Sequence, residues 1–127
     1  MNKAKRDFIV AILWFLVILV LLTLPGSALP KENWLDKIWA DKWVHIILFA
    51  LLVILWSVAF IRIKSESSDL KRIFGWVAFW SIVYGIGMEF IQKYFIPNRS
   101  FDVGDIIADA VGCLSGFIFC LRRYIKK

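Results

Sequence analysis

The chain has 127 residues, of which 61% are hydrophobic and 20% are charged, with a formal net charge of +6. A soluble domain is only about 45–50% apolar, and one this short could not bury so much apolar surface. These values exclude an ordinary soluble enzyme, a disordered chain, a collagen and a disulfide scaffold, and they predict one compact integral membrane protein.

The first apolar run covers residues 8–24 and holds 17 residues, which is close to the lower limit for a membrane-spanning helix. The basic segment before it and the small residues Gly26, Ser27 and Ala28 after it also resemble a secretory signal peptide. However, the run is longer than the usual apolar region of a signal peptide and contains Trp14. An uncleaved helix is therefore the favoured interpretation.

Three further apolar runs cover residues 43–61, 73–91 and 106–121, and they hold 19, 19 and 16 residues. The last run is long enough to span a membrane only if its helix begins near Asp102. None of the runs shows the alternation of barrel strands, and backbone groups in lipid must be bonded internally, so helices are predicted. The prediction is an all-α membrane protein, a single domain over residues 1–127 that forms a four-transmembrane-helix bundle. The expected helices are 8–24, 43–61, 73–91 and 102–121.

The basic residues are distributed unevenly along the chain. Eleven Lys and Arg residues lie at the two chain ends and in the loop after residue 61, whereas five lie in the other two loops. By the positive-inside rule, both termini face the cytoplasm in a multi-pass protein of the cytoplasmic membrane. The positive charge is then a topology signal and an attraction to anionic inner-leaflet lipid, so the expected partner is the bilayer and not a nucleic acid.

Polar residues inside the predicted spans gather at the ends that this rule places outside. In the last helix the spacing of three and four residues puts five of them on one face: Asp102, Asp105, Asp109, Gly112 and Gly116. The two glycines form a G-x-x-x-G sequence, which lets a neighbouring helix approach closely. We therefore predict that this face, with its carboxylates, points into the bundle.

The third predicted helix carries a similar stripe, with small residues in its middle and polar residues at its outer end: Ala78, Ser81, Gly85, Glu89 and Gln92. Two stripes of small residues predict a close helix pair. Gly112 and Gly116 are thus expected to pack against the Ser81–Gly85 face, with Gly85 as a further packing residue.

The second predicted helix opens with Asp41, Lys42 and His45, and Arg99 lies in the loop that precedes the last helix. Histidine exchanges a proton near neutral pH, so His45 is the first candidate for proton transfer. Arg99 is the candidate to hold a phosphate and to balance nearby carboxylates. The carboxylates would also suit a divalent cation, although no metal ligand set is assigned and the cofactor stays unknown.

Each of these residues also has a structural interpretation. Asp41 and Asp102 suit helix N-caps, His45 suits an interfacial hydrogen bond, and Arg99 suits an ion pair. The convergence of so many polar groups at one depth nevertheless favours a functional site. The catalytic candidates are His45, Glu89, Asp105 and Asp109, and the ligand-binding candidates are Arg99, Gln92, Asp102, Asp41 and Lys42.

Over roughly residues 41–116, the order of these residues resembles the VanZ-like family. The pattern of that family is D-K-x-x-H at the start of one helix, E-x-x-Q at the end of the next and R…D…D…N…G leading into the last. In this chain it corresponds to Asp41-Lys42-x-x-His45, Glu89-x-x-Gln92 and Arg99…Asp102…Asp105…Asp109…Gly112. The family more usually has Asn at the position of Asp109.

The resemblance implies a small bacterial cell-envelope protein, and the namesake of the family is associated with resistance to the glycopeptide teicoplanin. A family implies a fold and a motif, not a reaction, so whether the chain is an enzyme stays open. One hypothesis is an outward-facing site that binds or processes an envelope lipid, a lipid-linked precursor or another anionic ligand. The alternative is a non-catalytic accessory protein whose polar cluster is structural or binds a partner. Ion conduction is disfavoured, because no ionisable residue reaches the inner half of any predicted helix.

Overall fold

A computed structural model describes residues 2–23, 34–63, 67–96 and 101–125 of the chain. Within these ranges the chain forms four helices, α1 (Lys3–Leu22), α2 (Trp34–Ile61), α3 (Ser67–Phe95) and α4 (Val103–Tyr124), and it contains no strand. The all-α prediction is therefore confirmed for this part of the chain.

Three of the four helices are long and apolar enough to cross a membrane, with candidate spans at Lys42–Ile61, Asp69–Phe95 and Val103–Tyr124. The described part of α1 is short of a span, because its first two turns carry four charged residues, Lys3, Lys5, Arg6 and Asp7. The membrane character is confirmed, whereas a fourth span and the orientation in the membrane remain predictions.

The helix bounds differ from the predicted ones where polar residues extend an apolar run. α2 begins at Trp34 and α3 covers Ser67–Phe95. The added turns contain charged residues, so a search for apolar runs leaves them out. α1 begins at Lys3 because the Asn2 side chain accepts a hydrogen bond from the Lys5 amide at 2.8 Å.

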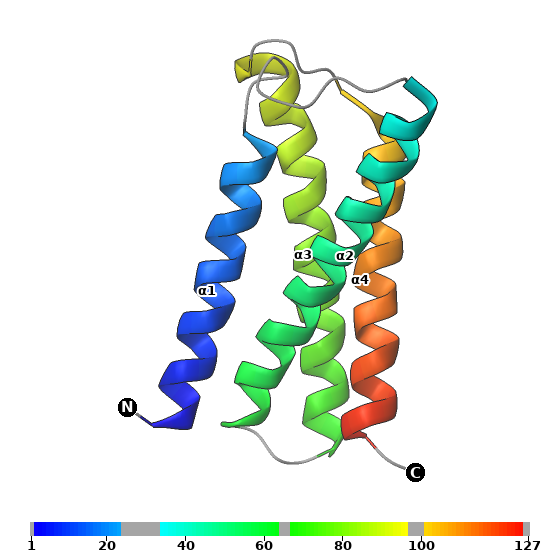
Figure 1. Ribbon diagram of the computed structural model, residues 1–127. Helices are drawn as coiled ribbons and strands as arrows, with labels where there is room; N and C mark the ends of the chain where they lie inside the picture. The colour runs from blue at the N-terminus through cyan, green and yellow to red at the C-terminus, as the bar shows by residue number, and fades with distance from the viewer. Residues whose placement is uncertain (1, 24–33, 64–66, 97–100, 126–127) are drawn as a thin grey trace.

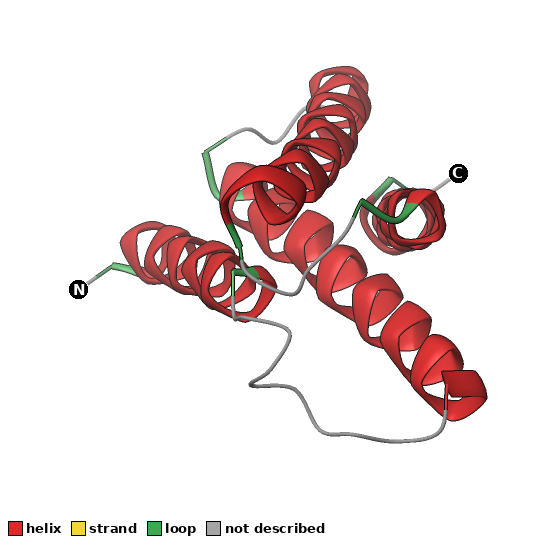
Figure 2. Cartoon of the chain, turned by 90° about the horizontal axis from the view of Figure 1, so that it is seen from above, coloured by secondary structure: helices red, strands yellow, loops and turns green. Residues whose placement is uncertain are grey.

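The helices lie side by side, and helices that follow one another in the chain run antiparallel (Figure 1). Figure 2 shows α2 crossing the molecule obliquely, with α1 on one side and α4 on the other. α2 packs most extensively against α4, and α3 packs against both. α2 is therefore the central helix of the fold.

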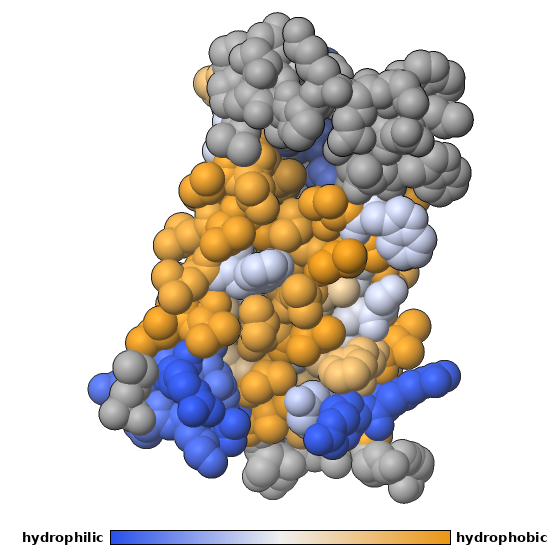
Figure 3. Space-filling view, in the orientation of Figure 1, coloured by the Kyte–Doolittle hydropathy of each residue, from blue (hydrophilic) through white to orange (hydrophobic). Residues whose placement is uncertain are grey.

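The two ends of the molecule carry different residues. We call the end where α2 and α4 begin the polar end, because it contains His45, Glu89, Asp105 and Asp109. The opposite end, where α1 begins and α4 ends (Figure 1), is the basic end and contains basic residues of α1, α3 and α4 together with Arg62, which follows α2. Between the two ends, the exposed side chains in Figure 3 are mainly apolar, as a membrane-facing surface requires.

The close approach at Gly112 and Gly116 involves α2, and the prediction that these glycines pack against α3 is wrong. A Cβ atom at Gly112 would collide with the carbonyl oxygen of Ile46, and one at Gly116 would lie 2.7 Å from that of Ala50. The α2 backbone therefore occupies the groove that the glycines leave on α4. The sequence did not reveal this partner, because α2 meets the groove with ordinary residues and has no stripe of small residues of its own.

Hydrogen bonds and aromatic contacts attach α1 to the other helices. The Trp14 Nε1 atom donates to the Leu48 carbonyl at 3.0 Å, and the Tyr84 hydroxyl donates to the Phe15 carbonyl at 3.0 Å. The rings of Phe15 and Tyr84 are stacked with centroids 4.4 Å apart. α1 thus contacts α3 around its middle and towards the polar end.

Candidate functional site

Polar side chains of three helices meet at the polar end. Lys42 and His45 lie about one turn apart on α2, and Asp105 and Asp109 lie about one turn apart on α4. Because α2 and α4 pack closely along their length, the two pairs come into register. The resulting contacts alternate between basic and acidic residues.

His45 and Asp109 form the most deeply buried contact of this cluster. The His45 Nδ1 atom lies 2.7 Å from Asp109 Oδ1, and the two residues are only 6% and 1% exposed. When Asp109 is ionised, its carboxylate only accepts hydrogen bonds, and the proton of this contact is then on Nδ1. Such a carboxylate–histidine pair fixes the orientation of the imidazole and leaves Nε2 available for proton exchange.

The Nε2 atom of His45 lies 3.6 Å from Asp105 Oδ2, which is longer than a hydrogen bond. On its other oxygen, Asp105 accepts a hydrogen bond from Lys42 Nζ at 2.8 Å. Lys42 also donates to Asp102 Oδ2 at 2.9 Å. One ammonium group therefore bridges two carboxylates, and one of these, Asp105, also faces the imidazole.

Asp102 is the N-cap that its structural interpretation suggested, and it has a second contact; its role in ligand binding stays a prediction. Its side chain caps α4 by accepting a hydrogen bond from the Gly104 amide at 2.8 Å, and it also pairs with Lys42. Burial opposes ionisation of Asp102, but the hydrogen bonds from Lys42 and Gly104 prevail and lower the pKa of this carboxyl group.

Glu89 connects α3 to the beginning of α4. Its Oε1 atom accepts a hydrogen bond from the Asp102 amide at 2.9 Å. Asp102 is at the N-terminal end of α4, where the helix dipole favours a negative charge. The residue is 0% exposed, and its Oε2 atom has no hydrogen-bond partner among the described residues. A buried oxygen of this kind costs free energy unless it finds a partner, such as a ligand, an ion or a water molecule.

Gly85 allows α3 to approach this cluster. A Cβ atom at Gly85 would lie 2.6 Å from Asp109 Oδ2, the second oxygen of the carboxylate that binds His45. That oxygen is also buried without a hydrogen-bond partner among the described residues. Glu89 follows Gly85 by one turn on the same side of α3. Two buried carboxylates, each with one unpartnered oxygen, thus approach the same region from α3 and α4.

The remaining candidates are placed differently. Gln92 is 1% exposed, and its Nε2 atom donates to the Leu22 carbonyl at 2.7 Å, so this amide binds the end of α1. The side chain of Asp41 and the whole of Arg99 lie outside the described residues. Their predicted roles, including Arg99 as the counter-charge of Glu89 and Asp105, remain predictions.

Lys42 is the cation whose structural role the sequence reasoning missed. The sequence predicts a ligand-binding role for Lys42 and makes Arg99 the counter-charge of the carboxylates. The spacing of Lys42 and His45 on one helix, matched by that of Asp105 and Asp109 on another, is the signal that pairs them. Recognising it requires knowing that α2 and α4 are neighbours.

Within the described ranges, no group of three or more His, Cys, Asp and Glu side chains is arranged to hold a metal ion. The nearest acidic groups are already engaged: Asp105 and Asp102 with Lys42, and Asp109 with His45.

A family model described as VanZ/LLP1 matches residues 7–125. The chain belongs to the VanZ/LLP1 family. The match begins in α1 and ends after α4, so it includes every described residue of the site. The resemblance that the motifs indicated over residues 41–116 is confirmed and extends to α1 in this VanZ/LLP1 protein. Neither the curated proteins nor the solved structures include a match to the chain.

Proposed function

We propose that this VanZ/LLP1 protein uses the polar end to bind, and to exchange a proton with, the anionic headgroup of an envelope lipid or a lipid-linked precursor. The observation that carries the proposal is the buried His45–Asp109 pair, whose 2.7 Å contact leaves His45 Nε2 facing Asp105, the carboxylate that binds Lys42 through its other oxygen. A histidine oriented in this way by a carboxylate is the usual arrangement of a general acid or base.

The depth of the site supports a lipid ligand. His45 and Glu89 lie close to the ends of the candidate spans Lys42–Ile61 and Asp69–Phe95. Those ends belong near the level of the headgroups when the spans cross a bilayer. A phosphate attached to a lipid would therefore reach His45 without leaving the membrane. We further propose that the polar end faces the outside of a bacterial cytoplasmic membrane.

The charge balance of the site requires another cation for an anionic ligand. Four carboxylates, Glu89, Asp102, Asp105 and Asp109, surround the ammonium of Lys42 and the imidazole of His45. The cluster by itself would repel a phosphate. Our proposal therefore includes Arg99, whose guanidinium would bind the phosphate in a bidentate manner, or a divalent cation that arrives with the ligand.

A non-catalytic role is the alternative, and one observation favours it. The polar contacts link the ends of all four helices: Gln92 binds α1, Glu89 binds the beginning of α4, and Lys42 binds α4 from α2. A network of this kind would also hold the bundle together. The two functions differ in whether activity can be lost while the fold is kept.

The test compares His45→Gln and Asp109→Asn with the wild-type protein, using Arg123→Ala at the exposed basic end as the control. Purified proteins are titrated with a polyprenyl phosphate, and bacteria that express them are assayed for teicoplanin susceptibility. We expect His45→Gln to lose the effect on susceptibility while its melting temperature in detergent stays close to that of the wild type. Loss of activity only in variants that also lose their fold would establish the accessory role instead.

A further inference from the structure

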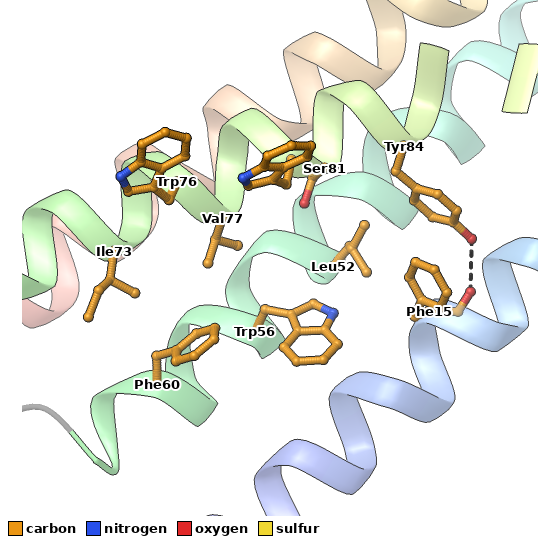
Figure 4. Close-up of a pocket in the computed structure, with 10 residues that line it drawn as sticks. Phe15, Leu52, Trp56, Phe60, Ile73, Trp76, Val77, Ser81 and Tyr84 are labelled. Atoms are coloured by element: carbon orange, nitrogen blue, oxygen red, sulfur yellow. Dashed lines mark hydrogen bonds between the residues drawn. The ribbon is translucent and has the colours of Figure 1, made fainter. Parts of the chain in front are cut away.

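A cavity of about 380 Å³ lies between α1, α2 and α3, away from the polar cluster. Figure 4 shows its walls: Leu52, Trp56 and Phe60 of α2 form one side, and the face of α3 from Ile73 to Tyr84 forms another. Phe15 of α1 lies at the end of the cavity beside Tyr84 (Figure 4). The cavity is open on one side, and the polar end has no part in its lining.

The path of α1 explains why the cavity exists. Near the basic end, Phe8 packs edge-on against Phe60 with ring centroids 5.3 Å apart, so α1 lies on α2 there. Further along, α1 reaches α3 through the stacked rings of Phe15 and Tyr84. Between that contact and the basic end, α1 does not cover α3, and the cavity lies between the two helices (Figure 4).

The shape and chemistry of the cavity suit one linear hydrocarbon chain. The cavity runs along α3 from Ile73 to Tyr84, and these two residues are eleven positions apart, which corresponds to about 16 Å of helix. Its lining is almost entirely apolar, and the hydroxyl of Tyr84 is engaged by the Phe15 carbonyl. It lies within the candidate spans of α2 and α3, where lipid chains are the surrounding solvent. An unfilled space there would forfeit the dispersion contacts that a chain supplies.

The charges near the Phe60 and Ile73 end of the cavity indicate which lipid supplies the chain. Arg72 precedes Ile73 on α3, and Arg62 follows Phe60 by two residues, just past the end of α2. Among the described residues, the basic end holds eight Lys and Arg side chains and two acids, Asp7 and Asp69. Asp7 is itself paired with Arg62 at 2.6 Å. A headgroup at this end therefore meets an excess of positive charge, which attracts anionic lipids.

We propose that this cavity is a specific phospholipid site, in which an acyl chain lies along α3 and an anionic headgroup binds at the basic end. The site is separate from the proposed activity at His45, and neither depends on the other. Its ligand is an anionic phospholipid of the bilayer itself, with a single chain between α1 and α3.

The first experiment needs no variant. The wild-type protein is purified in detergent and offered equal amounts of phosphatidylglycerol and phosphatidylcholine with identical acyl chains, and the retained lipid is counted by native mass spectrometry. We expect one phosphatidylglycerol per protein to be retained in preference to phosphatidylcholine. Equal retention of both lipids would overturn the proposal, because it would indicate unspecific surface lipid only.

Two variants then separate the chain from the headgroup. Val77→Trp fills the cavity, and its control Leu114→Trp adds the same side chain on the lipid-facing side of α4, where Leu114 is 51% exposed. We expect Val77→Trp to lose the retained lipid and the control to keep it, with both variants melting like the wild type in lipid-free detergent. Lipid retention by a folded Val77→Trp protein would contradict the proposal.

Arg72→Ala tests the binding of the headgroup. Its control is Arg123→Ala, which removes an arginine of α4 at the same basic end of the molecule. We expect Arg72→Ala to reduce the preference for phosphatidylglycerol about fivefold, which corresponds to about 1 kcal/mol for one basic residue at the membrane surface. The control should keep the preference. If both variants or neither changed it, or if the protein instead formed a dimer that excluded lipid, the assignment of the cavity would be wrong.

Discussion

At the residue scale, Asp109 is the partner on which the buried imidazole of His45 depends. Replacing Asp109 with Ala leaves a buried N–H group without its acceptor, so we expect the free energy of unfolding to fall by about 1–3 kcal/mol. Asp109→Asn keeps an acceptor oxygen in the same place and should melt close to the wild type. Thermal unfolding in detergent measures both, and an equally large loss in Asp109→Asn would show that the charge, not the hydrogen bond, stabilises His45.

Asp102 supplies a pH dependence whose sign follows from its contacts. Although burial opposes it, pairing with Lys42 and the Gly104 amide lowers the pKa of Asp102 in the folded state. Its contribution to stability is therefore complete above the pKa of the unfolded chain and is lost as the pH falls through the folded value. Asp102→Asn keeps an N-cap but removes the charge. We expect the melting temperatures of wild type and variant to differ at pH 6, and to begin to converge only as the pH falls below about 4 towards the folded pKa.

A difference between wild type and Asp102→Asn that stayed constant across that pH range would contradict this account. The control is Asp69→Asn, at the basic end on α3. It removes a carboxylate without touching Lys42 or the beginning of α4. The change in melting temperature between pH 6 and pH 4 and below should therefore be the same as in the wild type.

Single residues also show how far the sequence could predict the site. The spacing of Asp105 and Asp109 placed both on one helix face, and the structure brings them together with His45. The sequence could not assign the positive partner, because Lys42 and Arg99 were both within reach of the carboxylates along the chain. That choice depends on which helices are neighbours, and a spacing within one helix does not contain this information.

At the scale of elements, the contact between α2 and α4 is the closest in the molecule, and it tests the role of glycine directly. Gly112→Ala would drive a methyl group into the Ile46 carbonyl, so we expect it to lower the melting temperature markedly. Gly87→Ala is the matched control, since a Cβ atom there meets nothing within 4 Å. In that control the helix propensity of Ala should leave stability unchanged or raise it by up to about 1 kcal/mol.

The opposite ranking, with Gly112→Ala as stable as Gly87→Ala, would show that α2 and α4 are further apart than described. The sequence predicted that the glycines of α4 support a close helix pair but named the wrong partner. Small residues on α3 gave the misleading signal. Gly85 of α3 makes room for the side chain of Asp109, whereas Gly112 and Gly116 of α4 make room for the backbone of α2. A pattern of small residues does not distinguish the two.

At the scale of the whole molecule, orientation in the membrane is the prediction that most affects function. Both described ends of the chain lie at the basic end (Figure 1), and the positive-inside rule places this end in the cytoplasm. A cysteine at Ser67, where α3 begins, should react with a membrane-impermeant maleimide only after the cells are opened. A cysteine at Ser100 should react in intact cells. Labelling of the Ser67 variant from outside would show that the protein has the opposite topology, and that the polar end faces the cytoplasm.

The distance between the two ends has a consequence for the bilayer itself. His45 of α2 lies 17 positions before Arg62, just past the end of that helix, and on α3 Arg72 lies 17 positions before Glu89. This corresponds to about 25 Å of helix axis, whereas the hydrocarbon core of a typical bilayer is about 30 Å thick. The stretch between these polar groups is thus shorter than the hydrocarbon core, and local thinning of the bilayer is one way in which such a mismatch is relieved. Thinning beside α2 and α3 would lower nearby headgroups towards His45. We expect the protein to melt at a higher temperature in bilayers of short-chain lipids than in bilayers of long-chain lipids, and the same order should hold for any activity at the polar end.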